Sequence, residues 1–346
     1  MSRALDPAVK KALKQGNHQD VFEAVLALFA HRHDGGYLEI EILPSSHTLE
    51  PGTYILRDGP FVAVPKLRLV QAFIHARQIL NAYLANGHDV DVVAVQRATA
   101  ALLLMDSEHL TAANTRKRLV AGGLLPDAVR RRAEILQDEL YFVNSLLSSR
   151  LHRHTKSPVL WNHKRWLLRQ AGVQVDVSHE FREVVLVAAE RHPRNYYAWT
   201  YARDLVARHQ MASSPEDEGP TFVQTTIFPL VRTWCRFHHQ DISGWSFMLS
   251  LVLLLPAAVA RDTYEDVLGM TEKLQWRNET VWHFLKNMAR LPAVRARKEN
   301  RMRVMHVLRL LRKGLDDECL DARILDKAEA CIISVGKAPD QPTSLD

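Results

Sequence analysis

The chain contains 346 residues, 47% of them hydrophobic and 24% charged, which is typical of a soluble globular protein and long enough for two ordinary domains or one extended repeat array. Lys and Arg number 45 against 39 Asp and Glu, and the resulting net charge of +6 is spread along the chain, so composition indicates only a mild attraction for acidic partners. Three distant cysteines, Cys235, Cys319 and Cys331, exclude a disulfide framework. With a polar first twenty residues and no secretory signal pattern, we expect a reducing, cytoplasmic location.

Residues 1–65 are expected to combine one helix with irregular structure. In residues 21–29, "VFEAVLALF", the apolar side chains share one helical face. Residues 37–65 break that pattern with the alternation of "YLEIEI" and the turn signals "PSS", "PG" and "DGP", which predict extended segments and loops. From 66 to 346 helix follows helix, interrupted by an acidic loop at 213–219, so we expect a repeat array with C-terminal helices.

Tryptophan sets the register of this array. Four residues before each of four tryptophans stands a favoured helix N-cap residue; the pairs are Ser157 with Trp161, Asn195 with Trp199, Asp241 with Trp245, and Asn278 with Trp282. The tryptophans recur at intervals of roughly 40 residues, which is typical of a helical hairpin repeat. Each indole is expected to fill the wedge between successive hairpins and to bury on the order of 200 Å² of ring surface.

A fifth copy is degenerate. In "HLTAANTRKRLV", residues 109–120, Ala113 stands where the other copies have tryptophan, and a long second helix is expected to follow it. A helix pair cannot hide its own apolar stripe, so successive pairs stack. The sequence therefore predicts an all-α fold, a right-handed superhelical solenoid, or crescent, of antiparallel helix pairs, with repeat cores at about 105–290.

Two later segments have a biased composition, one strongly apolar and one strongly basic. The apolar run 247–260, "FMLSLVLLLPAAVA", is shorter than the ~20 residues needed to span a bilayer, so it predicts a buried core helix and no membrane span. The basic segment 295–313 carries Val304, Met305, Leu308 and Leu311 at helical spacing. Its cations are therefore interpreted as the solvated face of an amphipathic helix, in preference to a nucleic-acid site.

The sequence indicates no metal site in this chain. The three cysteines are isolated, and none of the 17 histidines forms a spaced cluster with Cys or Asp of the kind that binds zinc. The closest approaches are His152 with His154 and His238 with His239. We interpret them as solvated histidines at helix ends.

The order Asn-Tyr-x-x-Trp followed by Arg resembles the protein prenyltransferase alpha-subunit repeat. "HPRNYYAWTYARDLV", residues 192–206, carries the full pattern, and "SPVLWNHKRWLLRQ", residues 157–170, is a good second match. The remaining copies are diluted, because "DISGWSFMLSLV" loses the Arg, "NETVWHFLKNMA" has Lys, and "LTAANTRKRL" lacks the Trp. The chain is most similar to a divergent branch of that family.

The resemblance implies an alpha-type subunit of a heterodimeric protein prenyltransferase. Such a subunit wraps a beta subunit, an α/α barrel that holds zinc and the prenyl diphosphate, and the enzyme forms a thioether on a C-terminal cysteine of a protein substrate. A geranylgeranyl-type beta subunit is the expected partner, the cofactor zinc is expected in that partner, and the isolated chain is expected to be inactive.

The resemblance also implies where the chain would touch the departing diphosphate. Family members place a cation and a tyrosine five and three residues before the repeat tryptophan, and here Lys156, Arg194 and Tyr196 match those places, whereas Pro158 replaces the tyrosine of the second copy. A cation beside a helix N-terminus suits a diphosphate, because free N–H groups reinforce its charge. The alternative reading is that Lys156 and Arg194 are exposed loop cations.

Two arginines of the repeat are expected to be structural. Arg165 and Arg203 each follow a repeat tryptophan by four residues, and we expect them to donate to neighbouring carbonyls or to stack on indoles.

Two other function classes fit a helical array. One is a non-catalytic scaffold that keeps the repeat and binds proteins. The other is an RNA-processing helical repeat, which the Asn-Tyr-x-x-Trp order and the absence of a concentrated basic stripe disfavour.

Overall fold

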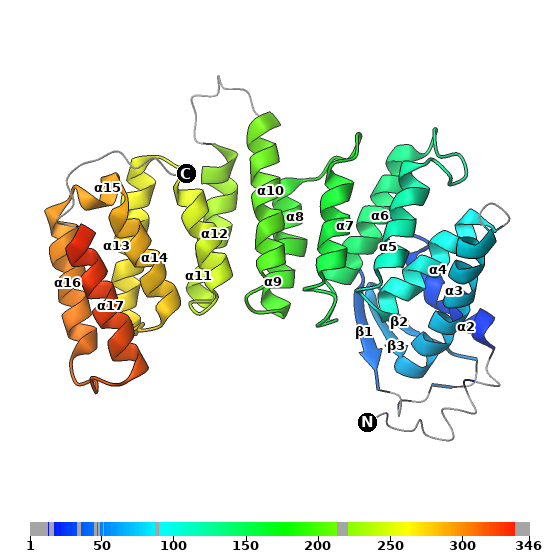
Figure 1. The fold of residues 1–346 in the computed structure, drawn as a ribbon, viewed down its shortest axis with the longest axis horizontal. Coiled ribbons are helices and arrows are strands. Elements are labelled where there is room, and N and C mark those ends of the chain that lie inside the picture. The colour runs from blue at the N-terminus through cyan, green and yellow to red at the C-terminus, as the bar shows by residue number, and fades with distance from the viewer. Residues whose placement is uncertain are drawn as a thin grey trace. The chain divides into compact units, whose positions relative to one another are not determined.

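The computed structural model describes residues 13, 17–32, 36–44, 47, 49–50, 52–86, 90–212 and 221–335. The acidic loop expected at 213–219 lies outside the described residues. The chain divides into two compact units, residues 1–205 and 206–346, and the division falls within one helix. Each unit is helical, as the sequence predicts, and the first also contains a small sheet (Figure 1).

The first unit begins with one helix and the sheet, followed by successive helices. Its elements are α2 (His18–Leu26), η1 (Ala27–Phe29), β1 (Glu39–Leu43), β2 (Leu56–Asp58), β3 (Phe61–Pro65), α3 (Lys66–Asn86), α4 (Val92–Met105), α5 (Leu110–Ala121), α6 (Arg132–Leu147), α7 (Pro158–Leu168), α8 (Val177–Glu180), the π-helical η3 (Phe181–Leu186), α9 (Val187–Arg191) and α10 (Tyr196–Ala212). Helix α2 packs on α3, α3 on α4, and α6 on α7.

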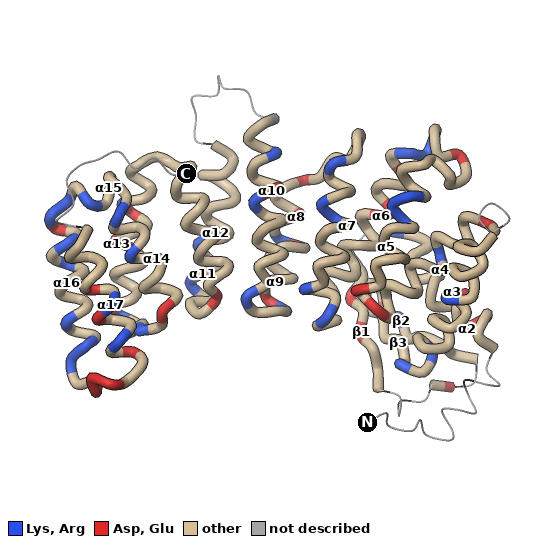
Figure 2. The backbone as a smooth tube through the Cα atoms, viewed as in Figure 1, with Lys and Arg blue, Asp and Glu red and all other residues tan. Residues whose placement is uncertain are grey.

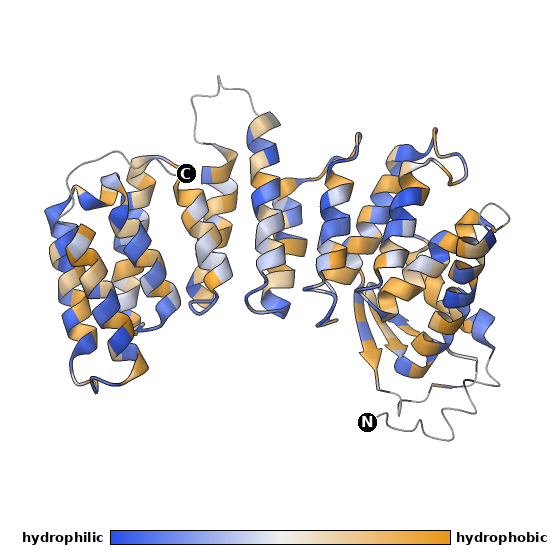
Figure 3. Ribbon diagram, viewed as in Figure 1, coloured by the Kyte–Doolittle hydropathy of each residue, from blue (hydrophilic) through white to orange (hydrophobic). Residues whose placement is uncertain are grey.

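The second unit is helical throughout its described residues. Its elements are the π-helical η4 (Val223–Ile227), α11 (Phe228–Phe237), α12 (Ile242–Val252), α13 (Ala257–Leu274), α14 (Glu279–Arg290), α15 (Pro292–Arg295), α16 (Lys298–Arg312) and α17 (Leu320–Val335). Helix α12 packs on α11 and α14, and α17 packs on α14 and α16. Apolar and polar residues interleave along these helices (Figure 3), which is the amphipathic pattern expected of stacked pairs.

Residues 37–65, expected to be extended segments and loops, form a three-stranded sheet. The strand order is β1-β3-β2, with β1 parallel and β2 antiparallel to β3. The free edge of β1 is covered by the end of α6 and the residues that follow it, because Ser145 Oγ accepts from Leu38 N at 3.1 Å and Ser149 Oγ accepts from Ile40 N at 2.9 Å. Two serine hydroxyls therefore replace a neighbouring strand.

The predicted helix starts are confirmed. Helices α7, α10, α12 and α14 begin directly after Ser157, Asn195, Asp241 and Asn278. The side chains of the first three accept hydrogen bonds from backbone N–H groups of the first helical turn, whereas Asn278 does not. No strand occurs between residues 160 and 290 in the part of the chain that the structure describes.

The repeat tryptophans are buried, as predicted. Trp161, Trp199, Trp245 and Trp282 are each at most 1% exposed. Three of the indoles also donate to a carbonyl oxygen in the loop before their own helix: Trp161 Nε1 to Thr155 at 2.9 Å, Trp245 Nε1 to His238 at 3.2 Å, and Trp282 Nε1 to Trp276 at 3.0 Å. The ring thus fills the core and also fixes the loop that precedes it.

The prediction of a single buried helix over 247–260 is wrong. Helix α12 ends at Val252, α13 begins at Ala257, and Leu253 and Leu254 between them are about half exposed. Pro256 explains the break, because proline lacks an N–H and disfavours helical geometry in the residue before it. Neither α12 nor any other helix of the described residues is long and apolar enough to span a membrane.

The basic segment 295–313 forms the amphipathic helix predicted for it. Val304, Leu308 and Leu311 are buried on one face of α16. Arg301, Arg303 and Arg309 are exposed on the other, where Figure 2 shows basic residues recurring along the helix. Its cations therefore form a solvated face, as expected.

We predict that Trp199→Ala lowers the free energy of unfolding by ~3–5 kcal/mol, because the substitution leaves a cavity in a close-packed core. Urea denaturation of the full chain measures this change. Trp166→Ala is the matched control, since Trp166 is only part-buried and should cost less. An unchanged denaturation curve for Trp199→Ala would contradict the packing role of the repeat tryptophan.

Candidate functional site

Three interhelical loops of the first unit are tied together at one end of its helices. We call residues 106–109, 148–157 and 192–195 the linked loops. Ser157 Oγ donates to the carbonyl oxygen of Ser107 at 2.9 Å, and Asn195 Nδ2 donates to that of Thr155 at 2.6 Å. Consecutive loops are thus joined by cap residues, which reach back by 50 and 40 residues along the chain.

Asn195 is the central residue of this connection. Its side chain is fully buried, its Oδ1 caps α10, and its Nδ2 also lies 3.2 Å from the carbonyl oxygen of Ala188. The sequence predicts only the cap, because the bond to Thr155 spans 40 residues and the bond to Ala188 depends on how α9 turns into α10. Asn278 makes a similar connection between loops in the second unit, where its Nδ2 donates to the carbonyl oxygen of His239 at 2.7 Å.

The linked loops bring two of the predicted site residues to neighbouring positions. Lys156 directly follows Thr155, and Arg194 directly precedes Asn195, so the hydrogen bond between Asn195 and Thr155 holds their backbones side by side. Arg194 is exposed, and its φ of 59° lies in the left-handed region, which is uncommon for a residue with a side chain. Figure 2 shows basic residues in the loops at these helix ends.

Tyr196 begins α10 beside these cations. Its ring is 51% exposed and packs on the ring of Tyr197, with 4.0 Å between the centroids. The hydrogen bond between the two hydroxyls, together with burial, raises the pKa of Tyr197 to about 12. Two phenol groups, Lys156 and Arg194 therefore stand near the N-termini of α7 and α10, an arrangement of donors that suits a multiply charged anion.

The two repeat arginines have structural partners. Arg165 Nε forms an ion pair with Asp204 Oδ2 at 2.5 Å, which joins α7 to α10. Arg203 Nη1 donates to the carbonyl oxygen of Trp199 at 3.3 Å within α10. The partner of Arg165 is therefore a carboxylate of the next repeat helix, where we expected a carbonyl or an indole.

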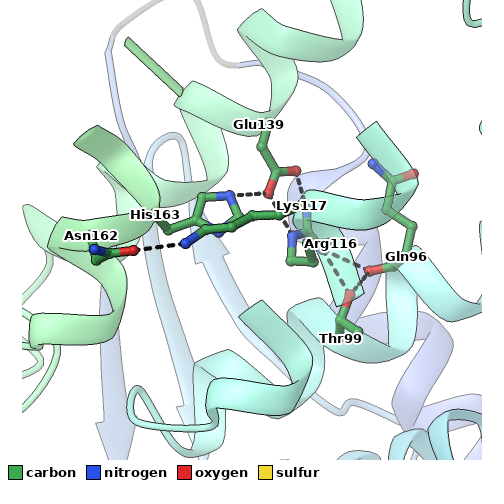
Figure 4. A network of polar contacts seen from close by, with 7 residues as sticks. All are labelled: Gln96, Thr99, Arg116, Lys117, Glu139, Asn162 and His163. Atoms are coloured by element: carbon green, nitrogen blue, oxygen red, sulfur yellow. Dashed lines mark hydrogen bonds and ion pairs between the residues drawn. The ribbon is translucent and has the colours of Figure 1, made fainter. Parts of the chain in front are cut away.

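A buried charged network lies between helices α4, α5, α6 and α7 (Figure 4). Arg116 of α5 makes a bidentate contact with Glu139 of α6, with Nε to Oε1 at 2.7 Å and Nη2 to Oε2 at 2.5 Å. Nε2 of His163 on α7 lies 2.8 Å from the same carboxylate, and Arg116 Nη1 donates to the carbonyl oxygen of Gln96 on α4. All three ionisable side chains are at most 5% exposed.

The network occupies the repeat that lacks a tryptophan. Arg116 lies on the same helix as Ala113, and its guanidinium stacks over the ring of Phe142 at 4.2 Å. A planar cation on an aromatic face contributes both packing and charge. Sequence reasoning missed this set because its members come from separate helices; the missing indole at position 113 was the available signal.

Charge balance governs protonation in this network. Burial raises the pKa of the Glu139 carboxyl, but Arg116 and His163 outweigh burial and hold that pKa at about 2. For His163, burial dominates and lowers the pKa of the imidazole, which favours the neutral ring 2.8 Å from the Glu139 carboxylate. The network is therefore one ion pair with a neutral histidine, closed from solvent, and we regard it as structural.

A second buried cluster lies between α7 and α10. Lys164 is fully buried and contacts Glu180 and Asn144, and its ammonium group lies 4.8 Å from the centre of the Tyr201 ring. The Tyr201 hydroxyl donates to Glu180 at 3.2 Å. Burial lowers the pKa of Lys164 and raises that of Tyr201. These groups satisfy one another and offer no open face to a substrate.

The interpretation of the paired histidines as solvated is wrong for His154. This side chain is buried, and its Nε2 lies 3.0 Å from the carbonyl oxygens of both Leu103 and Leu104. His238 and His239 instead stack on Trp234 and Trp276. Among the residues that the structure describes, no three His, Cys, Asp or Glu side chains form a group that could hold a metal ion.

The repeat region is similar in sequence to known proteins. Residues 160–273, which run from α7 into α13 and include three of the repeat tryptophans, match the family model described as the ECM9 middle domain. The chain is 26% identical over 222 residues to protein prenyltransferase alpha subunit repeat-containing protein 1 of Danio rerio. That alignment covers 58% of this chain and 47% of the zebrafish protein. This chain is a distant homologue of the prenyltransferase alpha subunit repeat-containing proteins.

A second relative supports the same relationship. Protein prenyltransferase alpha subunit repeat-containing protein 1-B of Xenopus laevis is 27% identical to this chain over 187 residues. The alignment covers 48% of this chain and 38% of the frog protein. The chain thus matches less than half the length of either curated relative. The homology agrees with the resemblance drawn from the Asn-Tyr-x-x-Trp pattern.

We predict that Glu139→Gln lowers the free energy of unfolding by ~3–5 kcal/mol, because it leaves the Arg116 guanidinium buried without a counter-charge. Urea denaturation at neutral pH measures the loss. Glu134→Gln is the matched control, because Glu134 forms an exposed ion pair with Arg131 and should leave stability almost unchanged.

The same carboxylate should make stability depend on pH. The pKa of Glu139 is about 2 in the folded chain against an ordinary value of 4.5, so the unfolded chain takes up the proton first. The stabilisation is therefore complete above about pH 4.5 and is lost as the pH falls toward 2. Between these two pH values the free energy of unfolding should fall more steeply with decreasing pH for the wild type than for Glu139→Gln. An equal pH dependence in both proteins would contradict the low pKa of Glu139.

Proposed function

We propose that this chain is the alpha-type subunit of a heterodimeric protein prenyltransferase, and that the linked loops face the diphosphate of a prenyl donor held by a beta subunit. The observation that carries the proposal is the joining of the Lys156 and Arg194 loops through Asn195, at the N-termini of two helices. Homology to prenyltransferase alpha subunit repeat-containing proteins supports the class of partner.

In this function the chain supplies charge and the partner supplies the metal. Thioether formation on a substrate cysteine releases diphosphate, and negative charge accumulates on that leaving group as the carbon–oxygen bond breaks. Lys156 and Arg194, reinforced by the positive dipole ends of α7 and α10, would stabilise this charge, and the Tyr196 hydroxyl would donate to it. Zinc, which would hold and activate the cysteine thiolate, belongs to the beta subunit in this proposal, and a geranylgeranyl-type subunit is the preferred partner.

The second candidate is a scaffold that keeps the repeats and binds proteins without contributing to catalysis. Pro158 favours it, because proline stands in the α7 repeat where the family pattern has the tyrosine beside Lys156. The two candidates differ in one measurable property, the transfer rate of the assembled complex.

Co-expression with prenyltransferase beta subunits tests the class of protein. We expect a one-to-one complex with a geranylgeranyl-type subunit that transfers a labelled geranylgeranyl group from its diphosphate to a protein bearing a C-terminal cysteine. The isolated chain should show no transfer. A complex that assembles but transfers nothing would favour the scaffold, and the absence of any complex would overturn the proposed partner.

We predict that Lys156→Ala and Arg194→Ala reduce the single-turnover rate of the heterodimer by roughly ten- to a thousandfold, because each removes charge that stabilises the transition state. Rapid-quench measurement of labelled product gives the rate, and size-exclusion chromatography checks that assembly is intact. Arg169→Ala is the matched control, since Arg169 is an exposed cation at the opposite end of α7. Wild-type rates for both variants would remove these residues from the site.

A further inference from the structure

The small sheet has one buried face and one outward face. Ile40, Val62 and Val64 are at most 2% exposed on the buried face. The register aligns Glu39, Phe61 and Asp58 in one row across the three strands, and Glu41, Ala63 and Leu56 in the next, so these six residues share the outward face. Phe61 is 58% exposed and Leu56 42% exposed, which is unusual for large apolar side chains so close together.

A hollow of about 390 Å³ lies over this face. Its lining includes Phe61 of the central strand β3, Leu56 of the edge strand β2, carboxylates on β1 and β2, and two arginines, Arg57 and Arg150. A space of this size accommodates a few side chains of a bound segment. None of the residues of the linked loops that face the proposed diphosphate site, Lys156, Arg194 and Tyr196, lines it.

The two edges of the sheet differ. The edge of β1 is occupied by Ser145 of α6 and by Ser149, two residues past the end of that helix, and these serines bond the backbone at Leu38 and Ile40. Strand β2 is the other edge, and among the described residues no backbone hydrogen bond is made to its side away from β3. An additional strand can therefore join the described sheet only at β2.

The charged residues of the outward face determine which kind of segment could bind at the β2 edge. Glu39 is neutralised by Arg191 and by Arg150, whose Nε lies 3.6 Å from Glu39 Oε2. Glu41 and Asp58 are exposed and have no ion-pair partner among the described residues. Asp58, which shares the outward face of β2 with Leu56, thus offers a strand joined at that edge a carboxylate without an ion-pair partner among the described residues.

We propose that β2 receives an extended segment of a partner protein as a fourth strand, and that this segment places an apolar side chain, flanked by Lys or Arg, over Phe61 and Leu56. Main-chain hydrogen bonds to β2 would supply affinity. Alternate side chains of the added strand would lie beside Leu56 and Asp58 on the outward face, where the apolar residue covers Leu56 and extends toward Phe61 and a cation pairs with Asp58. The proposal does not depend on the prenyltransferase assignment.

A displayed library of linear twelve-residue peptides, selected on the purified full chain, tests the proposal. We expect recovered peptides to share an apolar residue flanked by Lys or Arg, and synthetic copies to bind in fluorescence anisotropy. Phe61→Ser should weaken that binding by at least about tenfold. Leu84→Ser is the matched control, because Leu84 of α3 is 51% exposed and lies outside the hollow, and it should leave binding unchanged.

Two further experiments, one with a protein variant and one with N-methylated peptides, separate charge recognition from strand addition. Asp58→Lys should reverse the preference at the peptide position that faces residue 58, so that peptides with Glu or Asp there bind instead. N-methylation of one alternate set of peptide amides should abolish binding while methylation of the other set is tolerated, because an edge strand is contacted by every second amide. Failure to recover any peptide, peptides indifferent to Phe61→Ser, or equal effects of both methylation sets would each overturn the proposal.

Discussion

The carbonyl oxygen of Thr155 accepts two hydrogen bonds, one from Trp161 Nε1 of its own repeat at 2.9 Å and one from Asn195 Nδ2 of the next repeat at 2.6 Å. A buried carbonyl has two lone pairs to satisfy, and here each is used by a different helix. Because Trp161 lies in the first turns of α7 and Asn195 directly precedes α10, this one atom fixes the starts of the two helices relative to each other. The positions of Lys156 and Arg194 follow from that constraint.

The wedge between helices is filled in two physically different ways. In four repeats an indole fills the space between the helices, and the stabilisation comes from apolar area removed from water. In the α5 repeat a charged network does it, and the stabilisation depends on every member being present, since a buried charge without its partner is costly. A buried bidentate pair also tolerates fewer alternative packings than an indole, so this junction has the stricter geometry.

The parts of the fold that depend on local sequence were predictable. An N-cap followed by an apolar stripe specifies a helix start within one turn, which is why Ser157, Asn195 and Asp241 were placed correctly. The helix expected over 247–260 failed because apolar composition was weighed above Pro256. The sheet, the burial of His154 and the Arg116 network depend on which faces meet, and that information is spread over contacts between distant segments.

The serine hydroxyls that cover β1 have a consequence for the order of folding. Ser149 bonds Leu38 and Ile40 across more than a hundred residues of chain. During synthesis the strand therefore emerges long before the helix that completes its edge, and its backbone groups stay open until α6 has been made. Closing so long a loop is slow relative to forming the helices between, so β1 should dock on these serines after α3, α4 and α5 are in place. Strand β1 can thus pair with β3 early, whereas the serines that cover its other edge are among the last neighbours it acquires.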